Sequence, residues 1–240
     1  MGALIITHVC YGLFSDKLNV LETRLVDQLL VLRSKVNPVD RLNKNTVAHV
    51  DANSYFSRPQ HGQVIRNLAA MKVSAQLVDF IFEDMVSKAE DQPLIDATKS
   101  AGNVYFGLTF DSLSKPIGES NYPPETDDDY NPSSEKWQVV LNGDTESFYF
   151  GGNPRLPYPD LAASAQGLGF MNLTPDPDGF LRRLPLLVRH NGVLYPSLSF
   201  RTVCDYLGIG PENIIVNPGR SITLKGVRPV KGSEPHDLSL

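Results

Sequence analysis

The strongest constraint on the fold is an alternation of strand-like and helix-like segments in the first half of the chain. Thr46 to Val50 predicts a short buried strand, Pro59 to Met71 a helix, and Ala75 to Phe82 a strand covered on both faces, because that run is almost entirely apolar. Pro93 to Ser100 predicts a second helix beginning at its proline, and Val104 to Phe110 a third strand. This order predicts an α/β sheet with parallel strands and right-handed crossovers.

The second half carries turn signals that favour antiparallel pairing. Asn142-Gly143 separates two short strand-like segments, Trp137 to Leu141 and Ser147 to Phe150. A strand at Gly169 to Asn172 is followed by a proline-rich turn and by a returning strand at Phe180 to Val188.

A tight turn at Asn191-Gly192 then leads to a helix that starts at Pro196-Ser197 and ends at Gly208. Ile214 to Val216 and Ile222 to Leu224 predict closing strands. The fold class predicted is therefore α/β, with a mixed, largely parallel sheet flanked by helices and an antiparallel hairpin region in the C-terminal half.

Composition excludes several classes of function. The chain has 240 residues, 41% of them hydrophobic, and a net charge of -5 without any basic run, which argues against nucleic-acid binding. Cys10 and Cys204 are too few for a disulfide scaffold, and the five histidines, at positions 8, 49, 61, 190 and 236, lack the spacing of a metal site. We therefore expect no metal and no cofactor. The acidic run Asp127 to Asp129 is expected to be a solvated loop.

Two N-terminal segments leave alternatives open. Gly2 to Phe14 is apolar but shorter than the roughly 20 residues that span a bilayer, so it is either a buried element or the end of a truncated membrane anchor. The segment from Leu18 to Arg33 places five leucines, at positions 18, 21, 25, 29 and 32, on one helix face. That face requires a partner, which is either the protein core or a second copy of the chain.

The C-terminal half also carries a family resemblance. PDPDGFLRRLPLL from Pro175 to Leu187, followed by NGVLYPSLSF from Asn191 to Phe200, resembles the second type of CHASE domain, an extracytoplasmic sensory module. The segments LETRLVDQLLVLRS, TVAHVDAN and SAQLVDFIFEDM resemble the first helix and the first two strands of that family. One departure concerns Ser57-Arg58-Pro59-Gln60, where the family usually carries a tryptophan-proline pair before its first helix.

The resemblance implies a position outside the cytoplasmic membrane of a bacterium, between membrane helices that lead to a cytoplasmic cyclase or kinase. Residues 1–14 would then be the remnant of an N-terminal membrane anchor. Residues 15–240 would form a single α/β sensor domain, incomplete at its C-terminus. The implied partners are an unknown small-molecule ligand or a periplasmic protein, the membrane through flanking helices, and a second copy in a homodimer.

Four residues are candidates for ligand contacts. Asp51 ends a predicted strand and Asp79 lies within the next one. Ligands of open α/β sheets bind beyond the carboxyl ends of strands, which favours a ligand contact. The more ordinary role is a turn cap for Asp51 and a buried structural hydrogen bond for Asp79. Arg182 and Arg183 point to opposite faces of a predicted strand. One of them could hold an anion, although pairing with Asp176 or Asp178 is favoured.

Three hypotheses of function follow. The first is a non-catalytic sensor that binds a solute or partner and shifts a two-state balance. The second is a carboxylate- or metal-dependent hydrolase that uses Asp51 and Asp79. The third is a scaffold that dimerises through its leucine-rich helix and binds no ligand.

Overall fold

The chain is described here by a computed structural model that covers most of the segment after residue 55 and short parts before it. The described residues are 20–21, 23–29, 31–32, 35, 47–51, 56–114, 140–141, 148–176, 178–190, 193–218, 220–228 and 234–240. They divide into two compact units. The smaller contains Met1–Ala52 with Pro177–Phe180, and the larger contains Asn53–Asp176 with Leu181–Leu240.

The first sheet of the larger unit is built around a long central strand, β2 (Val104–Ser114). The first residues of β2 pair in parallel with β1 (Gln76–Val78) and with β5 (Gly167–Phe170). The later residues of β2 pair antiparallel with β4 (Tyr149–Arg155). The central strand thus joins a parallel part of the sheet to a mixed part.

The mixed part of this sheet continues beyond β4. The strand β6 (Leu187–His190) pairs in parallel with β4 and antiparallel with β7 (Val193–Pro196), so β6 and β7 form a hairpin. An isolated bridge between Phe170 and Ser197 links the end of β5 to the residue that follows β7.

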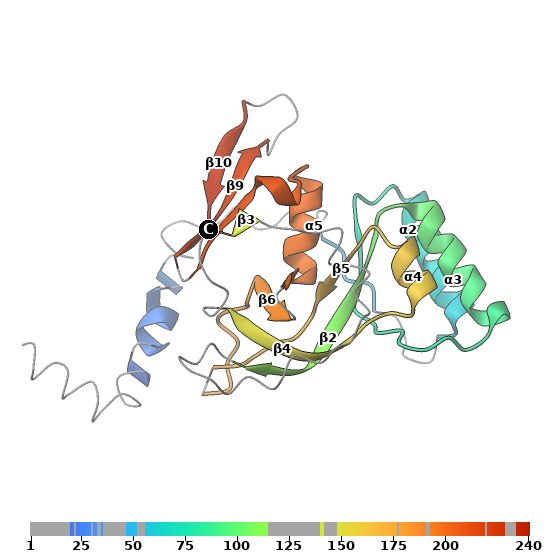
Figure 1. The fold of residues 1–240 in the computed structure, drawn as a ribbon, viewed down its shortest axis with the longest axis horizontal. Helices are drawn as coiled ribbons and strands as arrows, with labels where there is room; N and C mark the ends of the chain where they lie inside the picture. The colour runs from blue at the N-terminus through green and yellow to red at the C-terminus, as the bar shows by residue number, and fades with distance from the viewer. Residues whose placement is uncertain are drawn as a thin grey trace, which may run out of the picture. The chain divides into compact units, whose positions relative to one another are not determined.

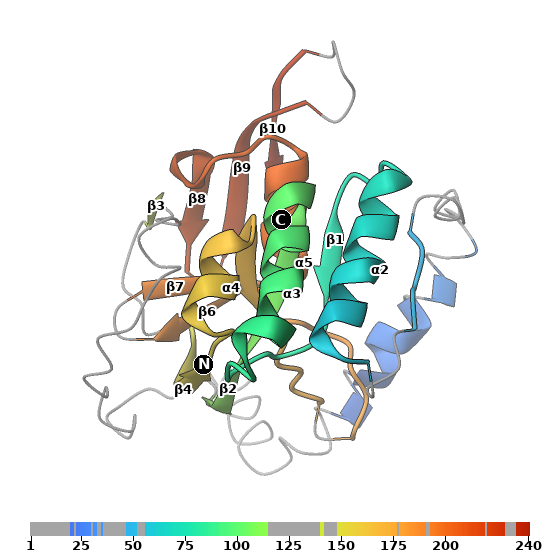
Figure 2. The same ribbon diagram turned by 90° about the vertical axis from the view of Figure 1, so that its right-hand side faces the viewer.

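Three helices, α2 (Arg58–Ala70), α3 (Lys88–Ala101) and α4 (Pro159–Ser164), lie side by side on one face of the parallel strands (Figures 1 and 2). Local signals define their ends. Ser57 and Gln60 form a capping box at the start of α2, and the Ser87 hydroxyl accepts a hydrogen bond from the Glu90 backbone N–H at the start of α3. Gly102 ends α3 with φ +67°, a left-handed conformation that favours glycine.

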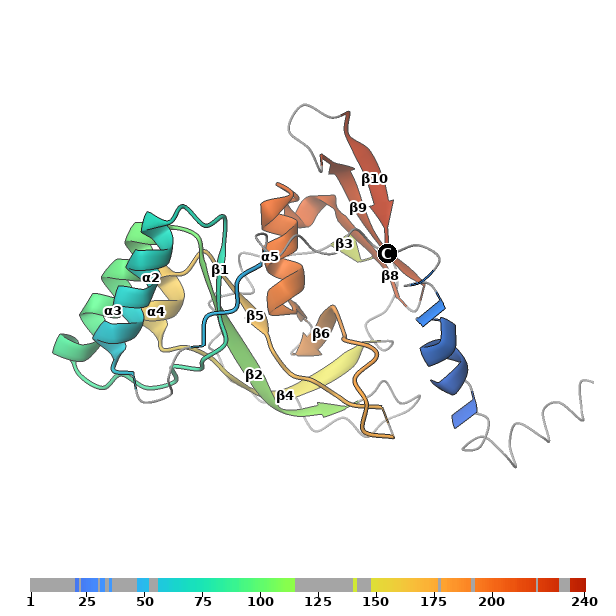
Figure 3. The same cartoon turned by 180° about the vertical axis from the view of Figure 1, so that it is seen from behind.

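A fourth helix, α5 (Leu198–Tyr206), packs against β5 on the opposite face of the first sheet (Figure 3). A second sheet lies beyond it, with the order β10 (His236–Ser239), β9 (Ser221–Val227), β8 (Ile214–Asn217) and β3 (Val140–Leu141). A short 3-10 helix, Pro211–Asn213, connects α5 to β8. The C-terminal strands therefore cover the side of α5 that the first sheet leaves open.

Two clusters of buried residues hold these layers together. The larger one joins the helical layer to the first sheet through Leu94, Phe106, Leu108, Leu161 and other side chains. The smaller one joins α5 to the second sheet and includes Phe200, Cys204, Ile214 and Leu224. The burial of these apolar side chains is the main favourable contribution to the stability of the larger unit.

The described residues confirm the α/β fold class. They also confirm the helix predicted from Pro59, the strand from Val104, the β6–β7 hairpin and the closing strands. The predicted helix at Pro196-Ser197 is confirmed as α5, whose N-cap is Ser197, and Gly208 follows it with φ +68°. The closing strands β8 and β9 are antiparallel.

Several boundaries and one strand were predicted wrongly. Residues 47–51 contain no strand and are exposed, so the first predicted βαβ unit is absent; the observed one is β1–α3–β2. The strand predicted over Ala75 to Phe82 is short, and Leu77 within it is exposed. Pro93 lies inside α3 rather than at its start, because Ser87 supplies the cap earlier in the sequence.

Other errors concern pairing. The segment from Phe180 to Leu186 contains no strand, and β6 pairs with β4 and β7 rather than returning along β5. The two strands expected to flank Asn142-Gly143 belong to different sheets, as β3 and β4. Asp127 to Asp129, Gly2 to Phe14 and Cys10 lie outside the described residues.

Candidate functional site

The four residues chosen from the sequence differ widely in their surroundings. Asp51 is exposed in an irregular segment of the smaller unit, and Asp79 is exposed directly after β1 in the larger unit. Asp79 is therefore not the buried structural residue that we expected. Arg183 is also exposed. Catalytic carboxylates usually require a desolvated setting, so these positions give the hydrolase hypothesis no support.

Arg182 differs from its neighbour because its side chain is only 8% exposed. Its Nη1 donates a hydrogen bond to Asp176 Oδ2 at 3.2 Å, which confirms the internal pairing favoured from the sequence. The contact links two parts of the irregular connection between β5 and β6. A role for Arg182 in binding an anion would require this contact to be shared or broken.

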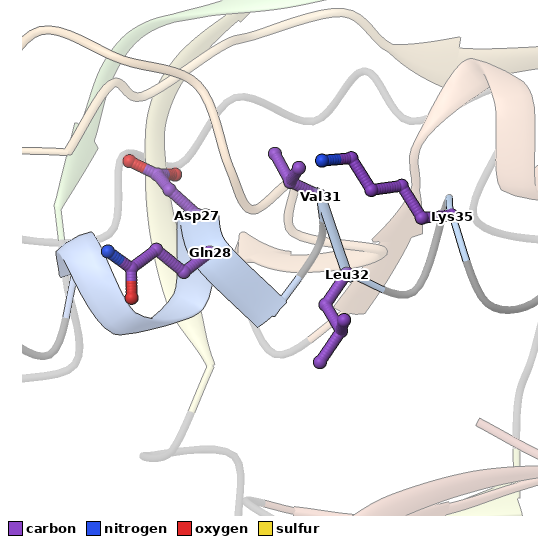
Figure 4. A pocket seen from close by; sticks show the side chains of 5 residues that line it. All are labelled: Asp27, Gln28, Val31, Leu32 and Lys35. Carbon is purple, nitrogen blue, oxygen red and sulfur yellow. The ribbon is translucent and has the colours of Figure 1, made fainter.

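A groove of about 340 Å³ runs along the helical part of the smaller unit. Among the described residues, its walls are the side chains of Asp27, Gln28, Val31, Leu32 and Lys35, which Figure 4 shows along one helical segment. A solute-binding site normally draws its walls from several elements that surround the ligand. The described lining of this groove therefore lies on one helical segment and does not surround a solute.

A more organised set of polar side chains lies in the larger unit, where three helices begin. Arg58 starts α2, Asp91 lies in the first turn of α3, Tyr158 is the N-cap residue of α4, and His61 lies in the first turn of α2. We refer to these four residues as the polar cluster. α3 precedes β2 and α4 precedes β5, and both strands belong to the parallel part of the sheet. The first turns of the two helices therefore lie beyond the carboxyl end of β1. Open α/β sheets bind ligands at this edge.

The centre of the polar cluster is a buried ion pair. Arg58 Nη1 lies 3.5 Å from Asp91 Oδ1, and the Asp91 side chain has no exposed surface. The other carboxylate oxygen of Asp91 accepts hydrogen bonds from the backbone N–H groups of Val86 and Ser87, at 2.8 and 3.0 Å. Arg58 Nη2 donates to the Asp84 carbonyl at 2.9 Å. One guanidinium and one carboxylate thereby connect α2, α3 and the segment that follows β1.

Aromatic rings surround these charges. The Arg58 guanidinium lies over the rings of Phe82 and Tyr158, at 4.5 and 5.4 Å from their centroids. The His61 ring meets Phe82 edge to face at 5.3 Å. Its Nδ1 lies 3.1 Å from the Ser57 carbonyl, an acceptor, so Nδ1 carries a hydrogen in this contact. Such packing excludes water and strengthens the electrostatic interactions within the cluster.

Four polar atoms of the cluster are buried without a hydrogen bond, namely Arg58 Nη1, His61 Nε2, Asp91 Oδ1 and Tyr158 Oη. Buried polar atoms are nearly always satisfied by protein or by water, and each exception requires an explanation. Here Arg58 Nη1 and Asp91 Oδ1 lie 3.5 Å apart as partners in the ion pair, and Tyr158 interacts electrostatically with both charged groups. Contacts within the cluster therefore account for three of the four buried polar atoms.

Two buried side chains of types that can act in catalysis, Tyr158 and Cys204, hold their protons tightly. Burial raises the pKa of Tyr158 to about 12, and the negative charge of Asp91 adds to this effect. A tyrosine that keeps its proton up to this pH is a poor general base near neutrality. Burial also raises the pKa of the Cys204 thiol to about 12, so Cys204 is not an activated nucleophile. Among the described residues, no three His, Cys, Asp or Glu side chains gather as metal ligands.

Sequence reasoning did not find the polar cluster. Its members are far apart in the chain, and Ser57-Arg58-Pro59-Gln60 was noted only as a departure from a family pattern. The available signal was local, because serine followed three residues later by glutamine predicts a capped helix start at Arg58. Nothing in the sequence pattern indicated that Asp91 would lie beside that helix start.

Comparison with known protein families gives a match that agrees with this fold. The family model of the CHASE2 domain matches residues 3–235, nearly the whole chain. The chain belongs to the CHASE2 family. CHASE2 domains are extracytoplasmic sensory domains of signalling proteins, and they are not catalytic. No curated protein and no solved structure matches this CHASE2 chain significantly. Among its described residues, no helix is long and apolar enough to span a membrane.

Proposed function

We propose that this CHASE2 domain lies outside the cytoplasmic membrane of a bacterium and senses a small solute or a periplasmic partner. In this proposal, flanking membrane helices connect it to a cytoplasmic cyclase or kinase. The observation that carries the proposal is the family match over residues 3–235. The sensory, non-catalytic character of CHASE2 domains supports a binding role rather than a catalytic one.

The signal is proposed to pass through the start of α2. The boundary between the two units falls between Ala52 and Asn53, shortly before Arg58. Arg58 contacts Asp91, the Asp84 carbonyl and the Tyr158 ring. A displacement at the start of α2 would therefore change the contacts of α3 and α4. A ligand that binds one arrangement of these contacts more tightly would shift the balance between two states of the domain.

Ligand contacts are proposed on both exposed and buried groups. Asp51, Asp79 and Arg183 are exposed and accessible to a solute or to a protein partner. Arg182 would contribute only if it exchanged its contact with Asp176. In the polar cluster, His61 Nε2 is buried without a hydrogen bond and would favour a small polar ligand.

Thermal-shift screening of the purified chain against small polar solutes tests this function. A solute that binds the native state raises the melting temperature, and the shift increases with solute concentration. Each hit is then incubated with the chain and assayed for chemical change. A sensor leaves the solute chemically unchanged. A smaller thermal shift in Asp51→Ala or Arg183→Ala shows that the replaced side chain contacts the solute. Consumption of the solute that is lost in Asp51→Ala would show that the chain is an enzyme instead.

A further inference from the structure

His61 carries a buried polar atom that the contacts within the polar cluster leave unsatisfied. The residue is only 8% exposed, and its Nε2 has no hydrogen-bond partner in the part of the chain that the structure describes. Its Nδ1 donates to the Ser57 carbonyl at 3.1 Å. With a hydrogen on Nδ1, the neutral imidazole has a lone pair on Nε2, whereas the charged imidazole has a second N–H there. Protonation of His61 would therefore create a buried donor without an acceptor.

Three phenylalanine rings surround the imidazole of His61. The rings of Phe80, Phe82 and Phe56 meet it edge to face, with centroids 5.0, 5.3 and 5.9 Å from its own. Burial among apolar rings disfavours the charged form of a histidine, because the charge loses its hydration. An aromatic ring can also attract a cation, but the Arg58 guanidinium already lies 4.5 Å from the Phe82 centroid. The aromatic surroundings therefore favour an uncharged His61.

The described charged groups around His61 do not provide a free counter-charge. Arg58 lies three residues earlier on α2, so the two side chains are neighbours and a positive His61 would be repelled. Asp91 of α3 is paired with Arg58 and accepts two backbone N–H groups. Tyr158 of α4 stays neutral, because burial raises its pKa to about 12. The connection between β1 and α3 adds exposed carboxylates, whose charges water and salt screen: Asp79, Glu83 and Asp84.

The position of His61 within its helix also disfavours a positive charge. α2 begins at Arg58, so His61 lies in the first turn. The first turn of a helix carries a partial positive charge, because its N–H groups point outward without helical partners, and it therefore disfavours a cation. Desolvation, the Arg58 charge and the helix dipole all oppose protonation at this one position.

We propose that His61 is a proton-binding site that acts as a pH-operated switch at the start of α2. While His61 is neutral, its ring stays among the three phenylalanine rings and the start of α2 is closed. As the pH falls below about 6.5, where histidine ordinarily takes up a proton, the charged ring leaves these rings and the contacts of the first turn of α2 weaken. The use of this switch as a signal rests on the proposed function and makes acidification the stimulus.

Urea unfolding between about pH 7.5 and pH 5.5, the range in which histidine changes its charge, tests the proton site. As the pH falls, the unfolded chain binds a proton at His61 that the folded chain resists. The ratio of folded to unfolded chain should therefore fall by up to about tenfold per pH unit. His61→Asn removes the titrating group but keeps an amide N–H for the Ser57 carbonyl, so this decline should disappear.

Two other histidines provide matched controls. His236→Asn replaces an exposed histidine in β10 and should leave the decline unchanged. His190→Asn replaces another buried histidine, which is 4% exposed, and should leave the contribution of His61 in place. Loss of the decline in His61→Asn alone supports the proposal. A decline that persists in His61→Asn, or a wild-type stability that is constant over this pH range, would overturn it.

Nitrogen NMR of the imidazole rings in the wild-type chain provides a test that needs no variant to fold. Near neutral pH, His61 should carry its hydrogen on Nδ1 and none on Nε2, and nuclear Overhauser contacts with the Phe80 and Phe82 rings identify its signals. On protonation these contacts should be lost, together with the hydrogen-exchange protection of the His61 backbone N–H, which donates to the Ser57 carbonyl. A charged His61 that retains both would contradict the switch.

The switch and the proposed function can fail separately. A solute that raises the melting temperature of a chain without any pH response at His61 would keep the sensor and overturn the switch. A pH response that is assigned to His61 in a protein found inside the cytoplasm would support the switch while contradicting the proposed location.

Discussion

Arg58 and Asp91 form an ion pair inside the helical layer, with 3.5 Å between Nη1 and Oδ1 and no exposed surface on the aspartate. A buried charge costs free energy unless an opposite charge and hydrogen bonds compensate for it. Asp91 has both, since its second oxygen accepts two backbone N–H groups at the start of α3. Removing either residue would therefore leave the other charge buried without compensation. The position of the start of α2 rests on both residues.

Replacing Asp91 by asparagine is expected to destabilise the chain by about 3 kcal/mol or more, because Arg58 would remain buried without its counter-charge. Urea unfolding of the purified variant measures this loss. The matched control is Asp79→Asn, at an exposed aspartate, which should change the free energy of unfolding by about 0.5 kcal/mol or less. Equal stability of the two variants would show that the ion pair contributes little.

Stability is expected to fall as the pH rises from 9 to 12. Burial raises the pKa of four groups to about 12, from 10 for the tyrosines and from 9 for the thiol: Tyr105, Tyr158, Tyr195 and Cys204. In this range the folded chain keeps protons that the unfolded chain has lost, so each group contributes a loss of at most about 1.4 kcal/mol per pH unit.

Urea unfolding at a series of pH values checks this dependence. Cys204→Ala should remove the part of the decline that begins near pH 9, because the tyrosines of the unfolded chain start to ionise only near pH 10. Constant stability up to pH 11 would contradict the burial of these groups.

Gly169 in β5 allows the start of α5 to pack closely on the sheet. A side-chain carbon at this position would lie 2.8 Å from the Ser197 carbonyl carbon and closer still to the Leu198 Cα. Since backbone atoms cannot yield easily, Gly169→Ala is expected to cost about 1 to 3 kcal/mol in unfolding experiments. Gly152→Ala is the matched control, because its new carbon would meet mainly the movable Ser112 hydroxyl at 2.6 Å. A larger loss in the control would contradict this packing.

Arg182 and Arg183 are expected to contribute differently to the free energy of unfolding. Arg182→Gln should lower the free energy of unfolding by about 1 to 3 kcal/mol, because Arg182 is buried and donates to Asp176. Arg183→Gln should change it by about 0.5 kcal/mol or less, since this side chain is exposed. Thermal and urea unfolding of both variants measure the difference. If Arg183→Gln proved the more destabilising, the assignment of the structural contact to Arg182 would be wrong.

The sequence predicts most reliably the elements whose ends carry their own signals. The helix α5 has a serine cap at Ser197 and a glycine stop at Gly208, and both were predicted from local chemistry. The run Ala75 to Phe82 was misjudged because apolar composition shows neither how many residues pair nor which face is covered. Leu77 lies in β1 and is exposed, and Phe82 is buried outside any strand.

The polar cluster could not be predicted from the sequence for a physical reason. Arg58 and Asp91 meet only because α2 and α3 pack side by side, and this contact depends on the tertiary structure. Asp79 and Arg183 were chosen because the sequence pattern predicted strands that include them. Both residues lie outside the observed strands, β1 and β6. Their role in ligand binding stays a prediction.

The location of the domain is tested most directly by labelling a new cysteine in intact cells. Met71, at the end of α2, is 73% exposed, so Met71→Cys in the full-length protein offers an accessible thiol. The parent protein, which retains Cys10 and the buried Cys204, gives the background. We expect a membrane-impermeant maleimide to label Met71→Cys in intact cells above that background. Labelling only after the cells are lysed would contradict an extracytoplasmic sensor.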